Sequence, residues 1–235
     1  MNTLKEVDGG DLGTIFVKYN VRAKRYTLRV YKGQVYATIP RGGNEKDMMT
    51  FVGEQREYLH KLMKERPARQ LLDENSEFRA FTFSLSITRN ELNHNYAAVK
   101  DGVLHISCEK DTDFSDLRTQ DMLWGVITNA LRLEAKRYLP QRLKMLAEKH
   151  GFQYSAVKIN NSRTHWGSCG SKKSINLSLS LMQLPEHLID YVLLHELCHT
   201  VEMNHSERFL ALMDKVTGGK TDELRSELKN NYKML

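Results

Sequence analysis

The stretch from Leu193 to Phe209 constrains this chain more than any other. It reads L-L-H-E-L-C-H-T-V-E-M-N-H-S-E-R-F and places His195 and His199 four residues apart. Residues at this spacing lie one turn apart on the same face of a helix, so the two imidazoles can bind one zinc ion. Glu196 stands beside them and can act on a water molecule held by the metal. The stretch therefore predicts a helix that carries metal ligands.

A catalytic zinc ion usually has three protein ligands and one open position. His205 follows His199 by six residues, as in the extended motif H-E-x-x-H-x-x-G-x-x-H, where the glycine lets the chain turn. Glu202 occupies the glycine position here. We therefore expect the helix to break at Asn204, because asparagine tolerates left-handed backbone geometry.

These residues predict a zinc site with ligands His195, His199 and His205. Glu196 would be the general base, which takes a proton from the metal-activated water and passes it to the leaving amine. By itself, the H-E-x-x-H pattern also fits two ordinary histidines of an amphipathic helix. The third histidine and the preceding apolar run L-I-D-Y-V-L-L favour the metal site. We expect Cys198 to serve in packing.

The first half of the chain has the pattern of a β-rich region with one helix. Apolar and polar residues alternate from Thr14 to Ile39, which predicts strands. Asn44 fits the N-cap of a helix that reaches about Lys64. Further strands are expected from Phe78 to Cys108, with a hairpin turn at Asp101-Gly102.

The second half is mainly helical. Apolar residues recur at helical intervals over residues 117–150, with Pro140 expected to kink or divide this helix and Gly151 to end it. Two short strands should follow, the second over residues 175–181. Pro185 fits the first position of the helix that contains the two histidines. We predict an α+β fold, with a β-rich region at residues 1–115 and a helical domain with a small sheet at residues 116–235.

Composition narrows the class of protein. The chain has 235 residues, of which 40% are hydrophobic and 27% charged, as in ordinary soluble proteins. No apolar run approaches the roughly 20 residues of a membrane helix, and the polar N-terminus does not fit a signal peptide. Three cysteines without a Cys-x-x-Cys pair argue against a disulfide framework. We therefore expect a cytoplasmic protein without a membrane partner.

The net charge is +6, and the excess of basic residues lies upstream of residue 151, where two basic clusters stand out. The first contains Lys18, Arg22, Lys24, Arg25, Arg29 and Lys32. The second contains Arg132, Lys136, Arg137, Arg142, Lys144 and Lys149. Such clusters can attract a nucleotide or a nucleic acid, or they can be solvated faces and partners of distant acids. The sequence favours the second interpretation and leaves the first open.

Three motifs in order resemble the YgjP-like metallopeptidases, zincins related to the SprT and WLM proteases. They are T-H-W-G-S-C, then I-D-Y-V-L-L-H-E-L-C-H, then N-H-S-E-R-F. The resemblance implies a zincin-like catalytic domain with the zinc ligands and base given above. It also implies that the Trp166–Cys169 loop and the strand at Ile175 to Leu179 border the cleft, with an extended peptide paired to an edge strand. The substrate-binding residues would then be Trp166, Gly167, Ser168, Ile175 and Leu177.

The chain departs from the family pattern at three positions. His165 stands where arginine is usual, and it is either an extra polar group at the cleft or a surface substitution. Ser178 replaces a frequent asparagine, and Leu210 replaces a tryptophan. None of these changes removes a predicted ligand or the base.

Three functions compete at this point. The first is a zinc-dependent peptidase acting on peptides or proteins. The second is a metal-dependent hydrolase of nucleotide phosphoanhydrides, because metal Lewis acidity also serves phosphoryl oxygens. The third is a protease tethered to nucleic acid by the basic clusters. The sequence leaves the substrate and the oligomeric state open.

Overall fold

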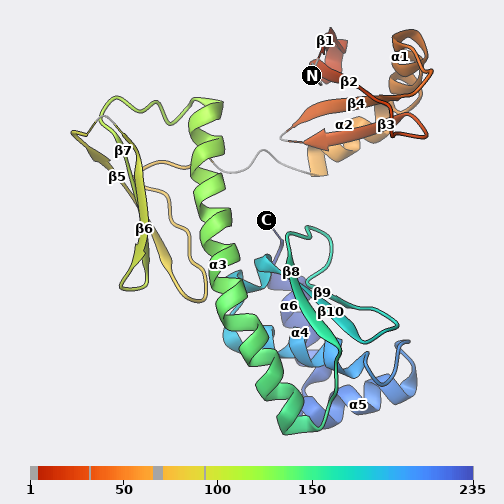
Figure 1. Ribbon diagram of the computed structural model, residues 1–235, viewed down its shortest axis with the longest axis vertical. Helices are drawn as coiled ribbons and strands as arrows, with labels where there is room; N and C mark the ends of the chain where they lie inside the picture. The colour runs from red at the N-terminus through yellow and green to blue at the C-terminus, as the bar shows by residue number, and fades with distance from the viewer. Residues whose placement is uncertain (1–4, 32, 66–70, 93, 235) are drawn as a thin grey trace. The chain divides into compact units, whose positions relative to one another are not determined.

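The computed structural model describes residues 5–31, 33–65, 71–92 and 94–234 and has an α+β architecture (Figure 1). The chain forms two compact units, residues 1–70 and 71–235. The boundary expected between residues 115 and 116 lies inside the second unit. The physical reason is that strand residues such as Ile87 and Ile106 share one hydrophobic core with the long helix that follows them.

The first unit contains a four-stranded sheet with the order β1-β2-β4-β3. Its strands are β1 (Lys5–Asp8), β2 (Thr14–Asn20), β3 (Thr27–Tyr31) and β4 (Gln34–Pro40). The alternation in the sequence buries one face of this sheet, where Ile15, Val35 and Ile39 have no exposed surface. These residues form the core of the unit together with Met48 and Leu59 from its helices.

The helix expected from Asn44 to Lys64 is instead two helices, α1 (Glu45–Glu54) and α2 (Arg56–Glu65). Asn44 is the predicted N-cap of α1, and its side chain accepts a hydrogen bond from the amide of Asp47 at 2.8 Å. The division falls at Gln55, which leaves helical geometry with φ −99° and ψ 9°. The apolar stripe continues across this break, so periodicity alone did not reveal it.

One three-stranded arrangement recurs in the three sheets of the described residues. In β2-β4-β3 of the first unit and in both sheets of the second unit, the first of three successive strands is parallel to the third, and the second is antiparallel to it, so the third lies between the other two. The first unit adds β1 at the outer edge of β2. In the second unit these sheets are β5 (Ser84–Asn90), β6 (Tyr96–Lys100) and β7 (Val103–Glu109), then β8 (Ala156–Asn160), β9 (Gly167–Cys169) and β10 (Ser174–Ser178). The predicted hairpin turn at Asp101-Gly102 joins β6 to β7, with φ values of 51° and 74° at its two residues.

Helix α3 (Leu117–His150) connects the two sheets of the second unit (Figure 1). Asp116 caps its start, and Gly151 ends it in left-handed geometry with φ 74°, as the sequence predicts. Pro140 does not divide the helix. Leu123 and Ile127 belong to the same core as the β5-β7-β6 sheet, while Leu139 and others further along α3 lie in the same cluster as α4.

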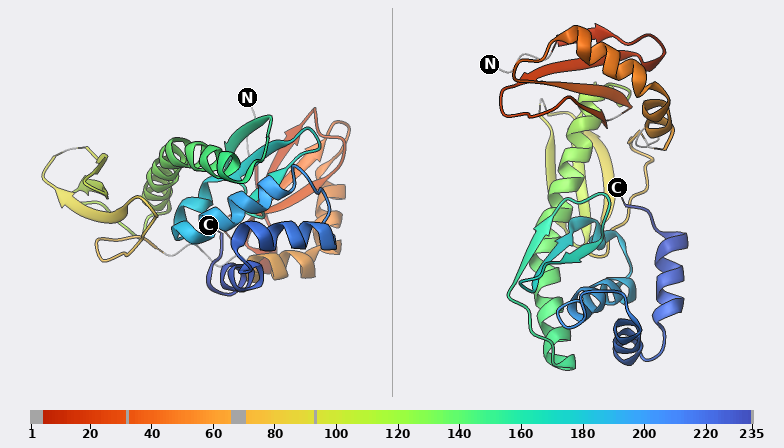
Figure 2. Two further views of the ribbon diagram at one scale, coloured as in Figure 1. Left: turned by 90° about the horizontal axis from the view of Figure 1, so that it is seen from below. Right: turned by 90° about the vertical axis from the view of Figure 1, so that its right-hand side faces the viewer.

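Three helices complete the second unit, α4 (Glu186–Cys198), α5 (Glu207–Thr217) and α6 (Thr221–Asn231), and they are drawn in blue in Figure 2. Pro185 immediately precedes α4, as expected. The strand expected over residues 175–181 ends at Ser178, whose hydroxyl accepts a hydrogen bond from the amide of Ser180 and starts a 3-10 helix, η2 (Leu179–Gln183). The three cysteines are free thiols. Within the described ranges, no helix has both the length and the apolar character to cross a membrane.

An ion pair joins α4 to α3. The guanidinium of Arg142 donates two hydrogen bonds to the carboxylate of Asp190, at 2.7 and 2.6 Å. Both side chains are about three-quarters buried, with 24% and 23% of their surfaces exposed. The acidic partner raises the pKa of Arg142 further. This paired geometry fixes the rotation of α4 and thereby the direction in which its histidines point.

We expect the change Asp190→Ala to lower the free energy of unfolding by about 2 kcal/mol, because it removes both close hydrogen bonds of a guanidinium that is mostly buried and leaves it with Glu186, 3.3 Å away. Urea denaturation measures this loss. The control is Lys144→Ala, which removes an exposed pair with Glu148 on the same helix and should cost less than about 0.5 kcal/mol. Equal losses in the two variants would contradict the anchoring role of Asp190.

Candidate metal centre

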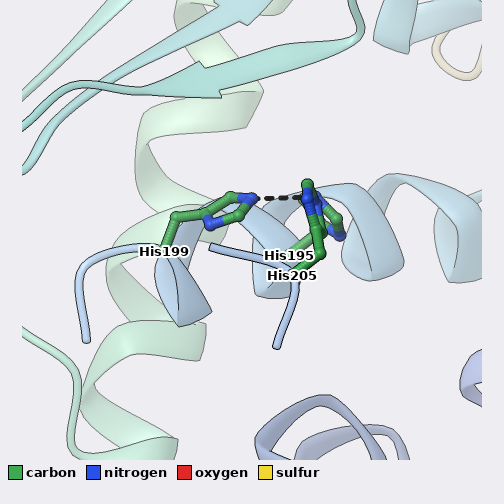
Figure 3. A group of neighbouring side chains, drawn as sticks. All are labelled: His195, His199 and His205. Carbon is green, nitrogen blue, oxygen red and sulfur yellow. Dashed lines mark hydrogen bonds between the residues drawn. The ribbon is translucent and has the colours of Figure 1, made fainter. Parts of the chain in front are cut away.

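Three imidazoles converge at the C-terminal end of α4 (Figure 3). The Nε2 atom of His195 lies 3.1 Å from that of His199 and 3.2 Å from that of His205. Tetrahedral nitrogen ligands, each about 2.0–2.1 Å from a zinc ion, lie about 3.3 Å from one another. The spacing is therefore within a few tenths of an ångström of a zinc-binding geometry. In the described part of the chain, no other group of three such side chains comes together in this way.

The chain reaches His205 by ending α4 early. The helix stops at Cys198, and the amides of Thr200 and Val201 then bond carbonyls three residues back, which tightens the last turn. The expectation of a left-handed break at Asn204 is wrong, because Asp101 and Lys173 are the non-glycine residues with positive φ among those described. The turn begins earlier, directly after Cys198. It needs no glycine, because the backbone at the C-cap residue His199 keeps ordinary right-handed geometry.

A hydrogen bond sets the orientation of His199. Its Nδ1 lies 3.1 Å from the carbonyl oxygen of Glu202. A carbonyl only accepts, so Nδ1 carries the proton and donates, and Nε2 presents its lone pair to the other two histidines. The residue at the missing glycine position thus contributes through its backbone.

Phe209 forms an apolar support for all three imidazoles. Its ring centroid lies 4.5 Å from that of His199, 4.8 Å from that of His205 and 5.0 Å from that of His195. The hydroxyl of Ser206 caps α5 by accepting a bond from the amide of Phe209, and so fixes where this helix begins. Sequence reasoning assigned Phe209 no role at the site. The sequence did contain a signal for this contact, because Phe209 follows His205 by four residues.

Burial favours the uncharged form of two of the imidazoles. It lowers the pKa of His195 to about 4, and its two histidine neighbours act in the same direction. Burial also lowers the pKa of His199. Neutral imidazoles are the form that binds a metal, so near neutral pH His195 and His199 present lone pairs rather than protons.

Glu196 lies beside this centre in a nearly dry position. Its side chain is 4% exposed, and its Oε2 atom is buried without a hydrogen-bond partner. Burial raises the pKa of Glu196 to about 8. A cation held by the adjacent histidines would oppose this shift by favouring the carboxylate. An unpartnered buried carboxylate next to three converging nitrogens is the arrangement expected of a proton acceptor for a water molecule.

Gly167 lies directly against Glu196. A Cβ atom at this position would approach Oε1 of Glu196 to 2.6 Å and its Cδ to 2.9 Å. The glycine of the W-G-S-C sequence therefore lets β9 pack closely on α4 and holds the carboxylate in place. Cys169, two residues further on, faces the same side, and the nearby Glu196 contributes to raising the pKa of its thiol after burial, which is the main cause.

The expectation that the strand of Ile175 and Leu177 is an edge strand is wrong. It is β10, the central strand of its sheet, and both side chains have no exposed surface. They are core residues and cannot touch a substrate. The edge strand next to α4 is β9. The sequence suggested only a loop or an irregular edge for these residues. A strand of three residues is too short to show alternation.

The hydrogen-bond register leaves part of β9 unpaired. The amide of Ser178 donates to the carbonyl of Trp166, and the amide of Gly170 donates to that of Ser174. Directly bonded pairs alternate along antiparallel strands, so the peptide groups of Gly167 and Cys169 point away from β10. They form an open edge beside Glu196.

The remaining predicted contacts fall in different places. Trp166 is half-buried against the core of the second unit. Ser168 is exposed, and its hydroxyl accepts a bond from the Asn176 side chain, on the face opposite to Gly167. His165 is exposed and bonds to the hydroxyl of Thr164 at 2.8 Å, which agrees with a surface substitution.

The chain is similar to one described protein family and to solved structures of metallopeptidase zymogens. The family described as "YgjP-like, metallopeptidase domain" matches residues 24–231. No curated protein matches the chain. Among solved structures, the metallopeptidase zymogen abylysin of Pyrococcus abyssi is 24% identical, with a TM-score of 0.36, over 41% of this chain and 99% of that one. The zymogen jannalysin of Methanocaldococcus jannaschii is 18% identical, with a TM-score of 0.35, over 39% and 93%.

We expect Gly167→Ala to lower the free energy of unfolding by about 1–3 kcal/mol, because the added methyl group overlaps a buried carboxylate. Gly125→Ala is the control. Gly125 is an exposed position in α3 where a Cβ meets no atom within 4 Å, so alanine should stabilise the helix by up to about 1 kcal/mol. Thermal denaturation measures both variants. A Gly167→Ala protein as stable as wild type would contradict the close packing.

Proposed function

The chain belongs to the YgjP-like metallopeptidase family, and we propose that it is a zinc-dependent peptidase in which Glu196 is the general base. The observation that carries the proposal is the convergence of three imidazoles next to a buried, unpartnered carboxylate. The metal ligands would be His195, His199 and His205. Three nitrogen ligands with one position left for water or substrate is the usual composition of a catalytic zinc site.

A zinc ion bound by the three histidines would supply Lewis acidity, which makes water more acidic and polarises the scissile carbonyl. The other tasks fall to side chains of this protein. Glu196 would accept the proton of the attacking water and deliver it to the leaving nitrogen. Gly167 would keep that carboxylate in position, and Phe209 would limit movement of the histidines and exclude water from below them.

We further propose that an extended peptide binds along the open edge of β9. The free peptide groups of Gly167 and Cys169 would pair with the main chain of the substrate, as in other cases of strand addition to a sheet edge. This assigns substrate binding to the backbone of β9 instead of the side chains of β10. Recognition through main-chain groups would tolerate many substrate side chains.

The first test is Glu196→Gln, which keeps the size of the side chain and removes its basicity. We expect peptide hydrolysis to fall at least about 100-fold, because proton transfer of this kind contributes roughly that much or more. Zinc content, measured by elemental analysis, should remain one ion per chain. The matched variant His205→Ala should lose zinc instead, because it removes a ligand and leaves the base.

The outcomes separate the alternatives. Normal peptide hydrolysis by Glu196→Gln would exclude Glu196 as the base. Hydrolysis of nucleoside triphosphates and not of peptides, abolished by a chelator, would replace the peptidase proposal with the phosphoanhydride hydrolase. Wild-type protein that binds no zinc would exclude both.

The second test concerns the edge of β9. Cys169→Pro removes an amide that points away from β10, so the sheet should tolerate it better than a proline within the ladder. We expect KM for peptides to rise several-fold relative to Cys169→Ala, which changes the side chain and keeps the amide. Zinc content should stay unchanged in both. Equal KM values in the two variants would argue against pairing at this edge.

A further inference from the structure

The sheet of the first unit has a second face that its helices do not cover. The buried face carries Ile15, Val17 and their neighbours, which pack on α1 and α2. Because side chains alternate along a strand, the intervening residues lie on the opposite face. Among them, Phe16 and Tyr36 are absent from the core cluster and are only partly buried.

Two aromatic rings and a guanidinium form a row across this open face. Phe16 on β2 is opposite Tyr36 on β4, which is opposite Arg29 on β3. The rings of Phe16 and Tyr36 stack with centroids 5.0 Å apart and planes 19° from parallel. In the next row lies Lys18, opposite Thr38. At the other end of the row, Glu6 on β1 is opposite Phe16. The face therefore offers aromatic surface next to Arg29 in the same row and Lys18 in the next one.

More cations lie at one end of the same face. The β2–β3 connection follows the C-terminal end of β2, and β4 ends beside it because the two strands are parallel. These two segments carry Arg22, Lys24, Arg25 and Arg41, all exposed or partly exposed. The exposed Val21, at 77%, lies in the β2–β3 connection. Tyr19, although 50% exposed, is opposite Ile39 and belongs to the other face of the sheet. Within the described residues, none of the six cations of the row and this end forms an ion pair.

The second basic cluster differs in this respect. On α3, Arg142 pairs with Asp190, Arg137 with Glu134 and Lys144 with Glu148. These cations are largely neutralised by neighbouring carboxylates. The acids of this face, Glu6 and Asp8, lie on the edge strand β1, opposite Phe16 and Thr14 and away from Arg29. Taken together, the strands β2, β3 and β4 carry cations and no acid.

We propose that this open face binds single-stranded nucleic acid. The stacked pair Phe16–Tyr36 would present aromatic surface to unstacked bases, and Lys18, Arg29 and the cations at the end of the face would contact the phosphates. A single strand fits better than a duplex, because bases inside a duplex cannot reach a ring on a sheet. An acidic peptide would satisfy the cations and leave the aromatic rings unused. The proposal does not depend on the peptidase activity.

The experiment measures binding of fluorescent 12-nucleotide oligomers, rU and dT, to the full-length protein by anisotropy over a range of salt concentrations. We expect both oligomers to bind, with affinity that falls as salt rises. Tyr36→Leu should weaken binding at least about fivefold, because stacking on an aromatic side chain contributes that much per base. Lys18→Ala combined with Arg29→Ala should reduce the slope of log affinity against log salt by about 1.4.

The matched control is Arg137→Ala combined with Lys144→Ala, which removes the same charge from the cluster that is already paired. It should change affinity less than twofold. Thermal melting and zinc content establish that each variant is folded, and Phe16→Leu provides an independent second test of the aromatic pair.

Five outcomes would overturn the proposal. Four concern the oligomers themselves: absence of binding at low salt, equal losses of affinity in the two double variants, unchanged binding after both aromatic substitutions, and tighter binding of a duplex of the same length. The fifth is displacement of the oligomer by poly-glutamate at equal charge concentration, because charge alone would then account for binding. None of these results bears on peptide hydrolysis, so the two proposals fail separately.

Discussion

The convergence of three imidazole nitrogens, with His195 Nε2 lying 3.1 Å from that of His199 and 3.2 Å from that of His205, is the constraint on which the second unit depends. Lone pairs that face each other repel unless a cation or a proton lies between them, so the surroundings must hold the rings in place. Phe209 packs on all three rings, the carbonyl of Glu202 holds one of them, and Ser206 fixes the start of α5. The site is thus built by the elements around α4 as much as by α4 itself.

The contact between Gly167 and Glu196 extends this constraint to the sheet. A carboxylate that is 4% exposed needs a neighbour that is close without being bulky, and glycine in β9 meets that need. The close approach places an edge strand along α4, with the peptide groups of Gly167 and Cys169 unpaired. The position of this carboxylate and the presence of a free sheet edge beside it are therefore two results of one packing arrangement.

The sequence predicted the parts of the fold and site that depend on local spacing. The strands of alternating residues, the capping residues Asn44 and Gly151, and the helix that carries the histidines follow from periodicity and cap chemistry. The predictions that were wrong had two different causes. The end of α4 is set by local main-chain bonds just beyond Cys198, which residue spacing does not show, and the central place of β10 is set by tertiary pairing with both β8 and β9. Alternation in β10 showed that one face is buried and gave no information on how many neighbours the strand has.

The repeated sheet topology explains why one arrangement can support different roles. In each group of three successive strands that share this arrangement, the third strand lies between the other two, so topology decides which strands have a neighbour on both sides. It does not decide what the outer faces carry. The β8-β10-β9 sheet ends in a short strand whose glycine approaches Glu196 of α4 closely. The sheet of the first unit instead has aromatic and basic residues on the face that its helices do not cover. Side-chain size on one face therefore distinguishes a sheet that packs closely on a helix from one with an uncovered face.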